Sequence, residues 1–165
     1  MSRAVLVPIN NALWHEYFRG YVADPMMTET PYVYDHSKCE DYFRKMMADA
    51  TRRYFAIVVD GKVVGQIYLK HIDWHGKTSS FGIALIDDSV KGKGYGTKAI
   101  QLLFDYAFDS LGLETIYADT VLGNVRSQYV LKKLGFIHVR DDANFSFYKI
   151  RRGDLGSPDF PEGGI

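Results

Sequence analysis

Three glycines within five positions, interleaved with a lysine and a tyrosine, stand directly before a helical pattern. They are Gly92, Gly94 and Gly96 in the stretch KGKGYGTK. Glycine lets the backbone approach a ligand closely and adopt conformations that a side chain forbids. The first turn of a helix presents unpaired N–H groups at the positive end of the helix dipole. This combination predicts a cradle for an anion such as a phosphate; a tight strand-to-helix turn without a ligand is the alternative that the glycines alone leave open.

Two common phosphate-binding loops do not match this stretch. A Walker loop has the pattern GxxxxGK followed by Ser or Thr, and GKGYGTK lacks that spacing. A dinucleotide-binding loop has the pattern GxGxxG, with an acidic residue about 20 positions later at the end of a second strand. Asp109 lies roughly in that range but falls on the polar face of the same predicted helix. Spacing and context therefore exclude both loops.

A second candidate segment is NVRSQYVLKKLGF, from Asn124 to Phe136. Asn124 suits the N-cap of a helix over residues 125–134, and Gly135 suits its C-terminal end. Ser127 shares the predicted inward face of that helix with three apolar residues, Val130, Leu131 and Leu134. Its hydroxyl either bonds to the backbone one turn earlier or faces a ligand, and the pattern leaves both open.

The remaining titratable cluster lies in the stretch HIDWH. His71, Asp73 and His75 alternate along a predicted strand, which invites interpretation as a metal site. A strand rises about 3.3 Å per residue, so the two histidines lie about 13 Å apart, too far to share one ion. We predict a polar, exposed hairpin end and no metal; a proton relay through water by one of these residues, or by Asp119, is the other interpretation. The single cysteine, Cys39, has no cysteine neighbour for a disulfide or a metal cluster.

The elements around these candidates predict one mixed domain. The hairpin YFAIVVDGKVVGQIYLKHI turns at Asp60–Gly61. Four helices are predicted. The first covers residues 12–23, and the second begins at an N-cap, Ser37, with Glu40 in the capping-box position. The third ends near Gly112, and the fourth covers residues 125–134. The third helix carries a predicted buried stripe of Ile100, Leu103, Phe104, Ala107, Phe108 and Leu111. The order β-α-α-β-β-β-α-β-α-β-β predicts an α/β fold (an α+β mixed sheet), with a largely antiparallel central sheet flanked by about four helices.

Length and composition limit the class of protein. The 165 residues suit one domain, and 47% hydrophobic residues suffice for a sizeable core. A formal net charge of +0 argues against a nucleic-acid partner. The N-terminal residues show no secretory signal, and no apolar run approaches the roughly 20 residues of a membrane helix. We predict a cytoplasmic protein with no membrane partner, a domain over residues 1–152 and a Gly/Pro-rich tail over residues 153–165.

The glycine and asparagine segments together resemble the GNAT N-acetyltransferase superfamily. KGKGYG, from Lys91 to Gly96, is similar to that family's (Arg or Gln)-x-x-Gly-x-(Gly or Ala) loop, although Lys91 lacks the two-pronged donor of an arginine. NVRSQYVLKKLGF is similar to the family's Asn-x-x-Ser…Lys-Leu-Gly-Phe signature, and DGKVVGQI resembles its early hairpin. The resemblance runs from Ala4 to about Arg152. Leu131 is the residue expected in the RimJ/RimL type of ribosomal-protein N-terminal acetyltransferase.

The resemblance implies a GNAT-like fold that binds acetyl-CoA, without a metal. The pyrophosphate is expected on the backbone amides from Gly92 to Thr97, and the pantetheine arm is expected along the exposed backbone of Ala84–Ile86. Ser127, the predicted catalytic residue, is expected near the thioester sulfur. The implied cofactor-binding residues are Ala84, Leu85, Ile86, Lys91, Gly92, Lys93, Gly94, Tyr95, Gly96, Thr97, Asn124 and Ser127.

Two departures from the family's pattern affect the expected chemistry. Leu131 stands where many members carry a tyrosine that protonates the leaving thiolate, and Tyr129 turns about 200° away around the helix. Ser80 stands where relatives often carry a glutamate base. Ser127 or water then serves the thiolate. An α-amine has a pKa of about 8 and a lysine amine about 10.4, so a site without an evident base favours an α-amine or a weakly basic amine.

The resemblance therefore predicts acetyl transfer from acetyl-CoA to a primary amine, either a protein N-terminal α-amine or a small-molecule amine, by direct attack. A non-catalytic acyl-CoA-binding module is the alternative, and a homodimer is a further expectation. Substrate choice in the family comes from the first two helices and their loop. There this chain carries aromatic and acidic residues that either hold a cationic amine or are ordinary core and surface residues. They are Trp14, Tyr17, Tyr21, Tyr32, Tyr34, Asp24, Glu29 and Asp35.

Overall fold

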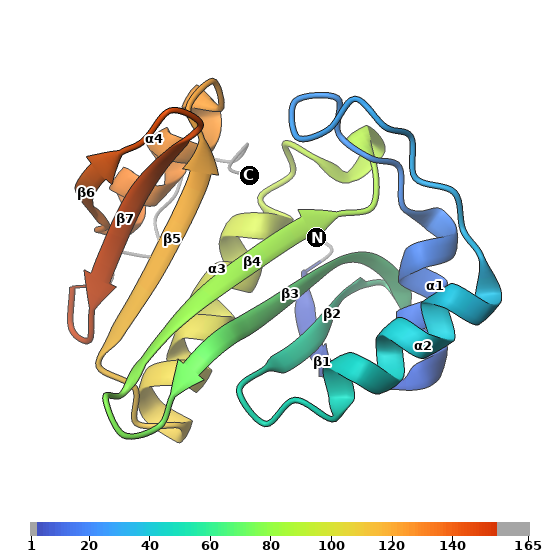
Figure 1. Ribbon diagram of the computed structural model, residues 1–165, viewed down its shortest axis with the longest axis horizontal. Helices are drawn as coiled ribbons and strands as arrows, with labels where there is room; N and C mark the ends of the chain where they lie inside the picture. Colours follow the sequence, from blue (N-terminus) through green and yellow to red (C-terminus); the bar gives the residue numbers. More distant parts are fainter. Residues whose placement is uncertain (1–2, 155–165) are drawn as a thin grey trace.

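A computed structural model describes residues 3–154 of the chain and shows one twisted sheet with helices on both faces (Figure 1). The predicted order of elements is confirmed. The elements are β1 (Val5–Pro8), α1 (Asn11–Gly20), α2 (His36–Met47), β2 (Arg53–Val59), β3 (Lys62–Asp73), β4 (Thr78–Leu85), α3 (Tyr95–Asp105), β5 (Thr115–Val121), α4 (Val125–Leu134), β6 (Ile137–Asp141) and β7 (Phe145–Arg151). A 3-10 turn (Asp88–Val90) precedes α3, and a π-helical turn (Tyr106–Ser110) continues it.

The sheet has seven strands in the order β1-β2-β3-β4-β5-β7-β6. Every neighbouring pair is antiparallel except β4 and β5, which run parallel, so the predicted largely antiparallel sheet is confirmed. A parallel pair needs a crossover connection, which α3 supplies between β4 and β5. The single parallel pair lies in the middle of the sheet, and there the two halves of the sheet separate (Figure 1).

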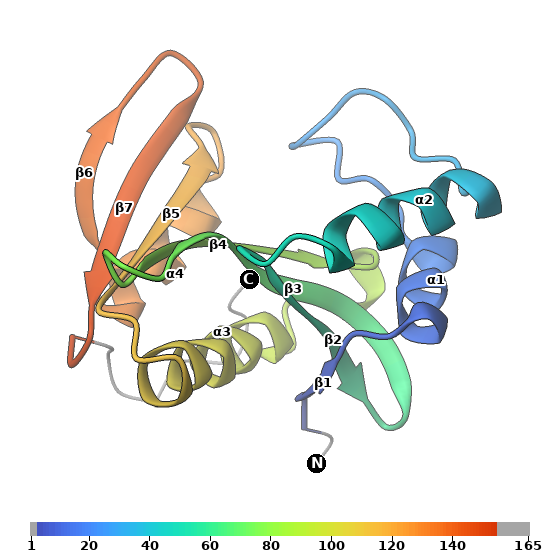
Figure 2. The same cartoon turned by 60° about the horizontal axis from the view of Figure 1, so that its bottom comes forward.

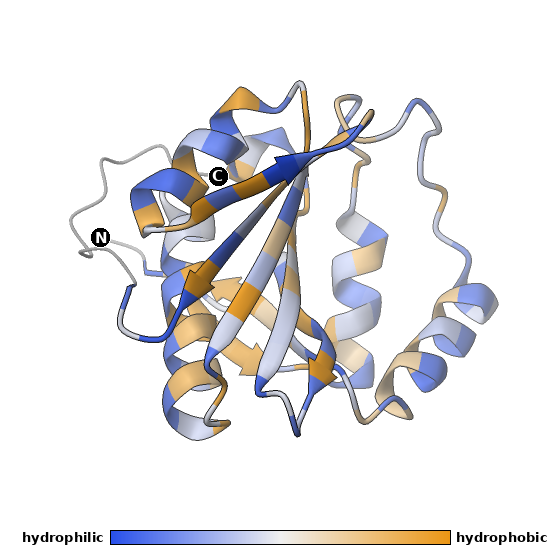
Figure 3. Ribbon diagram, turned by 60° about the vertical axis from the view of Figure 1, so that its left-hand side comes forward, coloured by the Kyte–Doolittle hydropathy of each residue, from blue (hydrophilic) through white to orange (hydrophobic). Residues whose placement is uncertain are grey.

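The main core lies between the sheet and α3. Helices α1 and α2 lie against the opposite face, as the rotated view makes clear (Figure 2). Hydropathy colouring shows apolar segments along several strands and a mixture of polar and apolar segments along the helices (Figure 3). The predicted stripe of the third helix is buried from Ile100 to Phe108, with Phe81 of β4 packed edge-on against Phe104 at a centroid distance of 5.0 Å. Leu111, the last residue of the stripe, is only partly buried.

The two N-terminal helices differ in detail from prediction. Helix α1 ends at Gly20, three residues early. Helix α2 is capped by Asp35, whose carboxylate accepts from the Lys38 amide at 2.9 Å, so the predicted Ser37 cap is wrong. Aspartate caps a helix as well as serine does, and it starts this helix two residues sooner. Glu40 does not close a capping box; it accepts two hydrogen bonds from Asn11 of α1.

Of the two turns that flank β3, one was predicted correctly and the other was not. Asp60 and Gly61 both have positive φ, 50° and 77°, so the predicted Asp-Gly turn between β2 and β3 is confirmed. At the far end β3 stops at Asp73, whose carboxylate accepts from the amides of His75 and Gly76 at 3.1 and 2.8 Å. His75 therefore lies in a turn and does not alternate with His71 on one strand; a carboxylate that binds the following amides ends the strand. Within residues 3–154 no three His, Cys, Asp or Glu side chains are grouped to hold a metal ion.

The predicted tail over residues 153–165 lies almost entirely outside the described residues, which end at Asp154. None of the helices in the described range combines the length and the apolar content that crossing a membrane requires.

Candidate active site

The separation of β4 from β5 leaves one edge of β4 without a strand partner. The two strands pair only through Thr78–Ser80 and Thr115–Tyr117, and beyond these residues they diverge (Figure 1). On its other edge β4 remains paired with β3 as far as Leu85, and the amide of Ile86 also donates to β3, at 2.9 Å. Successive residues of a strand direct their N–H and C=O groups to opposite edges. Ile83 and Leu85 therefore direct theirs into the gap.

This register decides which backbone groups a pantetheine arm can reach. Within the predicted stretch Ala84–Ile86, the groups of Leu85 face the gap, whereas those of Ala84 face β3. Ile86 has both groups engaged, because its carbonyl also accepts from the Val22 amide at 2.7 Å. The sequence pattern identified the strand but could not show which of its residues direct their backbone groups into the gap, because that depends on the pairing with β3.

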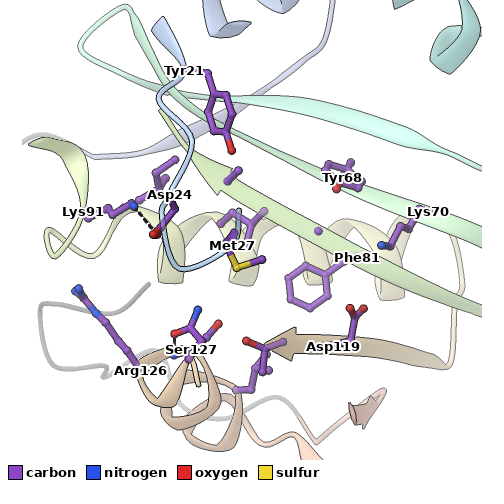
Figure 4. Close-up of a pocket in the computed structure, with 18 of the residues that line it drawn as sticks. Tyr21, Asp24, Met27, Tyr68, Lys70, Phe81, Lys91, Asp119, Arg126 and Ser127 are labelled. Atoms are coloured by element: carbon purple, nitrogen blue, oxygen red, sulfur yellow. Dashed lines mark hydrogen bonds and ion pairs between the residues drawn. The ribbon is translucent and has the colours of Figure 1, made fainter. Parts of the chain in front are cut away.

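A cavity of about 410 Å³ occupies the gap between β4 and β5 (Figure 4). Its walls come from the loop after α1, from β3, β4 and β5, and from the first turns of α4. Five of the predicted site residues line it: Ala84, Leu85, Lys91, Asn124 and Ser127. Ile86 and the glycine loop over residues 92–97 are not among the lining residues, and the loop continues from the Lys91 corner of the cavity.

The glycine loop has the backbone that the sequence predicted. Gly92 and Gly94 have φ values of 74° and 82°, in the left-handed region that favours glycine. Gly94 is the N-cap of α3, so no side chain caps the first amides of that helix. Thr97, in the first turn, is buried, and its hydroxyl has no hydrogen-bond partner within residues 3–154. The N-terminus of α3 therefore presents several backbone donors and one hydroxyl that the described protein atoms do not satisfy.

Lys91 does not point to the glycine loop as a free charge. Its Nζ donates to carboxylate oxygens of Asp24 and Asp88, each at 2.9 Å. Burial opposes the charged form, but these two bonds outweigh it and raise the pKa of Lys91. The bond from Lys91 and one from the Met26 amide lower the pKa of Asp24. Lys91 therefore ties the loop after α1 to the start of the glycine loop.

Arg126 is a cavity residue that the sequence analysis did not select. It lies in the first turn of α4, and a methyl group built on Gly92 would lie 3.3 Å from its Nη2. Figure 4 shows the guanidinium directed toward the side of the cavity where Lys91 lies. A cation in the first turn of a helix opposes the helix dipole. The first turn of α4 contains no acidic residue. An arginine in that unfavourable place could therefore have been recognised in the sequence as a candidate anion-binding residue.

Helix α4 positions the second predicted segment as expected. The Oδ1 of Asn124 accepts from the Ser127 amide at 3.0 Å, which confirms the N-cap, and Gly135 ends the helix with φ of 106°. Within the described residues the Ser127 hydroxyl makes no hydrogen bond to the preceding turn, so it faces the cavity without a protein partner. Leu131 lines the cavity one turn later, while Tyr129 is 52% exposed on the outer side.

The end of the cavity beside the paired part of β4 and β5 carries aromatic and charged residues. Tyr68 of β3 lies over Gly82, its cross-strand partner on β4; a methyl group on Gly82 would be 2.5 Å from the Tyr68 hydroxyl oxygen. Burial raises the pKa of Tyr68, so its hydroxyl stays protonated near neutral pH. Lys70 and Asp119 also line this end. Only Asp119 was considered in the sequence analysis, because Tyr68, Lys70 and Gly82 belong to no local motif.

Most of the predicted substrate-selecting residues lie outside the cavity, and two of them line it. Trp14 and Tyr17 are core residues, exposed by no more than 3%, and Asp35 is the α2 cap. Tyr34 donates to or accepts from His15 at 2.7 Å, while Tyr32 and Glu29 are exposed. Tyr21 and Asp24 alone of the eight line the cavity.

Comparison with known proteins identifies relatives of this chain. A family model described as an acetyltransferase (GNAT) domain matches residues 3–137. Spermidine N(1)-acetyltransferase of Escherichia coli (strain K12) is 31% identical over 96 residues, which are 58% of this chain and 51% of that protein. The chain thus matches about half the length of this curated relative.

Solved structures share the fold at lower sequence identity. The dodecameric structure of spermidine N-acetyltransferase from Vibrio cholerae has a TM-score of 0.75 at 18% identity and covers 91% of this chain and 94% of that one. The N-acetyltransferase PseH of Campylobacter jejuni has a TM-score of 0.72 at 20% identity, covering 91% of this chain and 99% of that one. These similarities confirm the predicted fold class.

Proposed function

The chain belongs to the GNAT acetyltransferase family, of the RimJ/RimL type that Leu131 indicated, and we propose that it transfers an acetyl group from acetyl-CoA to a primary amine. The observation that carries the proposal is the gap between β4 and β5, which opens beside an uncapped helix N-terminus preceded by two left-handed glycines. An exposed strand edge suits a peptide-like chain, and a helix N-terminus suits a diphosphate.

The residues present fit coenzyme A. The amides from Gly92 to Thr97 and the unpartnered Thr97 hydroxyl would hold the diphosphate, with Arg126 as the nearby cation. The gap-facing backbone of Ile83 and Leu85 would hold the pantetheine arm. Lys91, bonded to two carboxylates, fixes the shape of the loop and is not the main phosphate ligand. Acetyl-CoA supplies the acetyl group as a thioester.

The reaction balances as amine plus acetyl-CoA giving amide plus thiol. A C–N bond forms as the C–S bond breaks; the amine nitrogen loses one proton and the thiolate gains one. Ser127, whose hydroxyl has no hydrogen-bond partner within residues 3–154, lines the cavity and would donate a hydrogen bond to a leaving sulfur. Leu131 excludes water from that side but has no proton to give. Holding the two reactants in the geometry of attack lowers the entropic part of the barrier to such a transfer.

A non-catalytic acyl-CoA-binding module is the second candidate. Two observations favour it: Leu131 stands in the usual tyrosine position, and Ser80 stands in the usual glutamate position. Release of free thiol from acetyl-CoA, measured against a panel of primary amines, separates the candidates. Amine-dependent thiol release supports the transferase; calorimetric binding of CoA without thiol release for any amine supports the module and contradicts the transferase.

Relatives named for spermidine acetylation support a small amine as acceptor. A protein N-terminal α-amine is the other acceptor class consistent with the RimJ/RimL type. A homodimer and a cytoplasmic location stay predictions; one solved relative is a dodecamer.

A further inference from the structure

Two opposite charges, Lys70 and Asp119, line the cavity beside the paired part of β4 and β5; Lys70 is partly buried and Asp119 is exposed. Lys70 pairs with Ser80, and Ser80 pairs with Tyr117, so these three side chains share one face of the sheet. Asp119 lies two residues beyond Tyr117 and returns to the same face. Both Lys70 and Asp119 line the cavity, and Figure 4 shows the ammonium and the carboxylate directed into the space beside Phe81.

Both charges are open to solvent or to a ligand. Within residues 3–154 no hydrogen bond or ion pair reaches the Lys70 ammonium or the Asp119 carboxylate, and they do not pair with each other within 4.0 Å. At the opposite end, by contrast, Lys91 is bonded to Asp24 and Asp88. A cavity that satisfies its charges at one end and leaves one charge of each sign at the other is complementary to a ligand that brings both partners.

The charge balance distinguishes two kinds of amine. With Asp24 and Lys91 paired, and Arg126 beside the glycine loop, the acceptor end holds one carboxylate and one ammonium. A polyamine would bring several positive charges to a single carboxylate and would place one of them near Lys70. An amine with one carboxylate of its own would pair with both side chains. A phosphate dianion would bring two negative charges to the single ammonium and would lie beside the Asp119 carboxylate.

The cavity wall also carries apolar and aromatic surface. Tyr68, Phe81, Met27 and Leu131 line the cavity, and the Tyr68 ring is held over Gly82. Such walls suit an apolar or aromatic side chain on the acceptor.

We propose that the acceptor is a small amino acid-like zwitterion, whose amine is bound by Asp119 and whose carboxylate is bound by Lys70. This inference rests on the proposed acetyl transfer and specifies its substrate class. Asp119 accepts hydrogen bonds from the amine, and Lys70 donates to the carboxylate, so the nitrogen is held at the end of the gap where the pantetheine arm terminates.

The test uses pairs of compounds that differ only in the carboxylate: L-phenylalanine with 2-phenylethylamine, and L-methionine with 3-(methylthio)propylamine, with spermidine as the polyamine. We measure kcat/KM by thiol release, and Kd by calorimetry with CoA present. The expected result is a preference of at least about tenfold, or about 1.4 kcal/mol, for the amino acid of at least one pair, in both measurements. Lys70→Glu should reverse that preference and admit spermidine, while Asp119→Asn should weaken binding of both members of a pair.

The matched control is Lys149→Glu, which changes the same charge on the same face of the sheet, opposite Tyr117 but outside the cavity lining. It should leave the preference unchanged. The proposal is overturned if the decarboxylated amines or spermidine bind and react as well as the amino acids in the unchanged protein, or if Lys70→Glu and Lys149→Glu have equal effects. Those outcomes leave acetyl transfer intact. A protein that binds no CoA contradicts the proposed function itself, and calorimetry with CoA alone reports that separately.

Discussion

The contact between Gly82 and Tyr68 makes Gly82→Ala a quantitative test of how the cavity is shaped. The two residues are cross-strand partners, and the new methyl group would lie 2.5 Å from both the Cζ and the hydroxyl oxygen of Tyr68. No relaxed contact is so short, so the ring must move. It cannot retreat toward β2, because it stacks there on Tyr54 at a centroid distance of 4.6 Å. The ring is therefore displaced toward the cavity.

Overpacking of this kind costs about 1–3 kcal/mol of unfolding free energy. In a domain of this size 1 kcal/mol corresponds to about 2–4 °C, so Tm should fall by about 2–12 °C. The displaced ring should also raise KM for the amine and leave the affinity for CoA little changed, because the glycine loop lies at the other end of the cavity. Thermal unfolding and steady-state kinetics measure the two effects.

A double-mutant cycle with Tyr68→Leu isolates the contact. In that background Gly82→Ala should cost at least about 0.5 kcal/mol less than in the unchanged protein, because interaction energies above that limit mark residues in contact. Gly112→Ala serves as a control, since Gly112 has φ of 70° and open space around it, so its cost is backbone strain and should be equal in both backgrounds. An equal cost of Gly82→Ala with and without the Tyr68 ring would refute the reasoning.

Three further predictions concern other parts of the site. Ser127→Ala should leave Tm unchanged, because its hydroxyl has no partner within the described residues, and should lower kcat by about a hundredfold if it serves the thiolate; an unchanged kcat would assign that role to water. Asn124→Ala should cost about 1 kcal/mol in urea unfolding through loss of the cap, whereas Asn124→Asp should not; equal losses would contradict the capping role. The bond to Lys91 lowers the pKa of Asp24 from 3.8, so the stability it contributes is present above that value and lost as pH falls through the lowered pKa. The pKa of Lys91 is raised from 10.5, so the stability that this lysine contributes is present below pH 10.5 and is lost as pH rises through the raised pKa. Asp24→Asn should weaken the change of unfolding free energy with pH in both the acidic and the basic range. An unaltered pH profile would contradict the contribution of the Asp24–Lys91 pair to stability.

Features encoded by neighbouring residues were predictable from the sequence. The Asp60–Gly61 turn and the Gly135 helix end each depend on a few adjacent positions, and both were predicted correctly. The periodic stripe of the third helix is buried from Ile100 to Phe108, and only its last residue, Leu111, is partly buried. The Asn124 cap belongs to the same class. The glycine loop was predictable because the left-handed backbone at Gly92 and Gly94 leaves a direct mark on composition.

Features that depend on long-range pairing were not predictable. Whether Ala84 or Leu85 faces the gap is fixed by the register with β3, which the strand's own sequence does not contain. The partners of Lys91 include Asp24, 67 residues earlier, so its side chain could not be placed from the loop alone. Lys70 and Asp119 come from different strands and line one cavity only because β4 separates from β5 beyond Ser80 and Tyr117.

Binding of CoA observed at individual backbone amides is the most direct measurement for this protein. In two-dimensional NMR spectra, CoA should shift the amide signals from Gly92 to Thr97, whereas pantetheine, which lacks the diphosphate, should shift signals along β4 and leave that loop unaffected. If CoA binds and the Gly92–Thr97 amides do not respond, or respond equally to pantetheine, the diphosphate is held elsewhere and the account of the site is wrong.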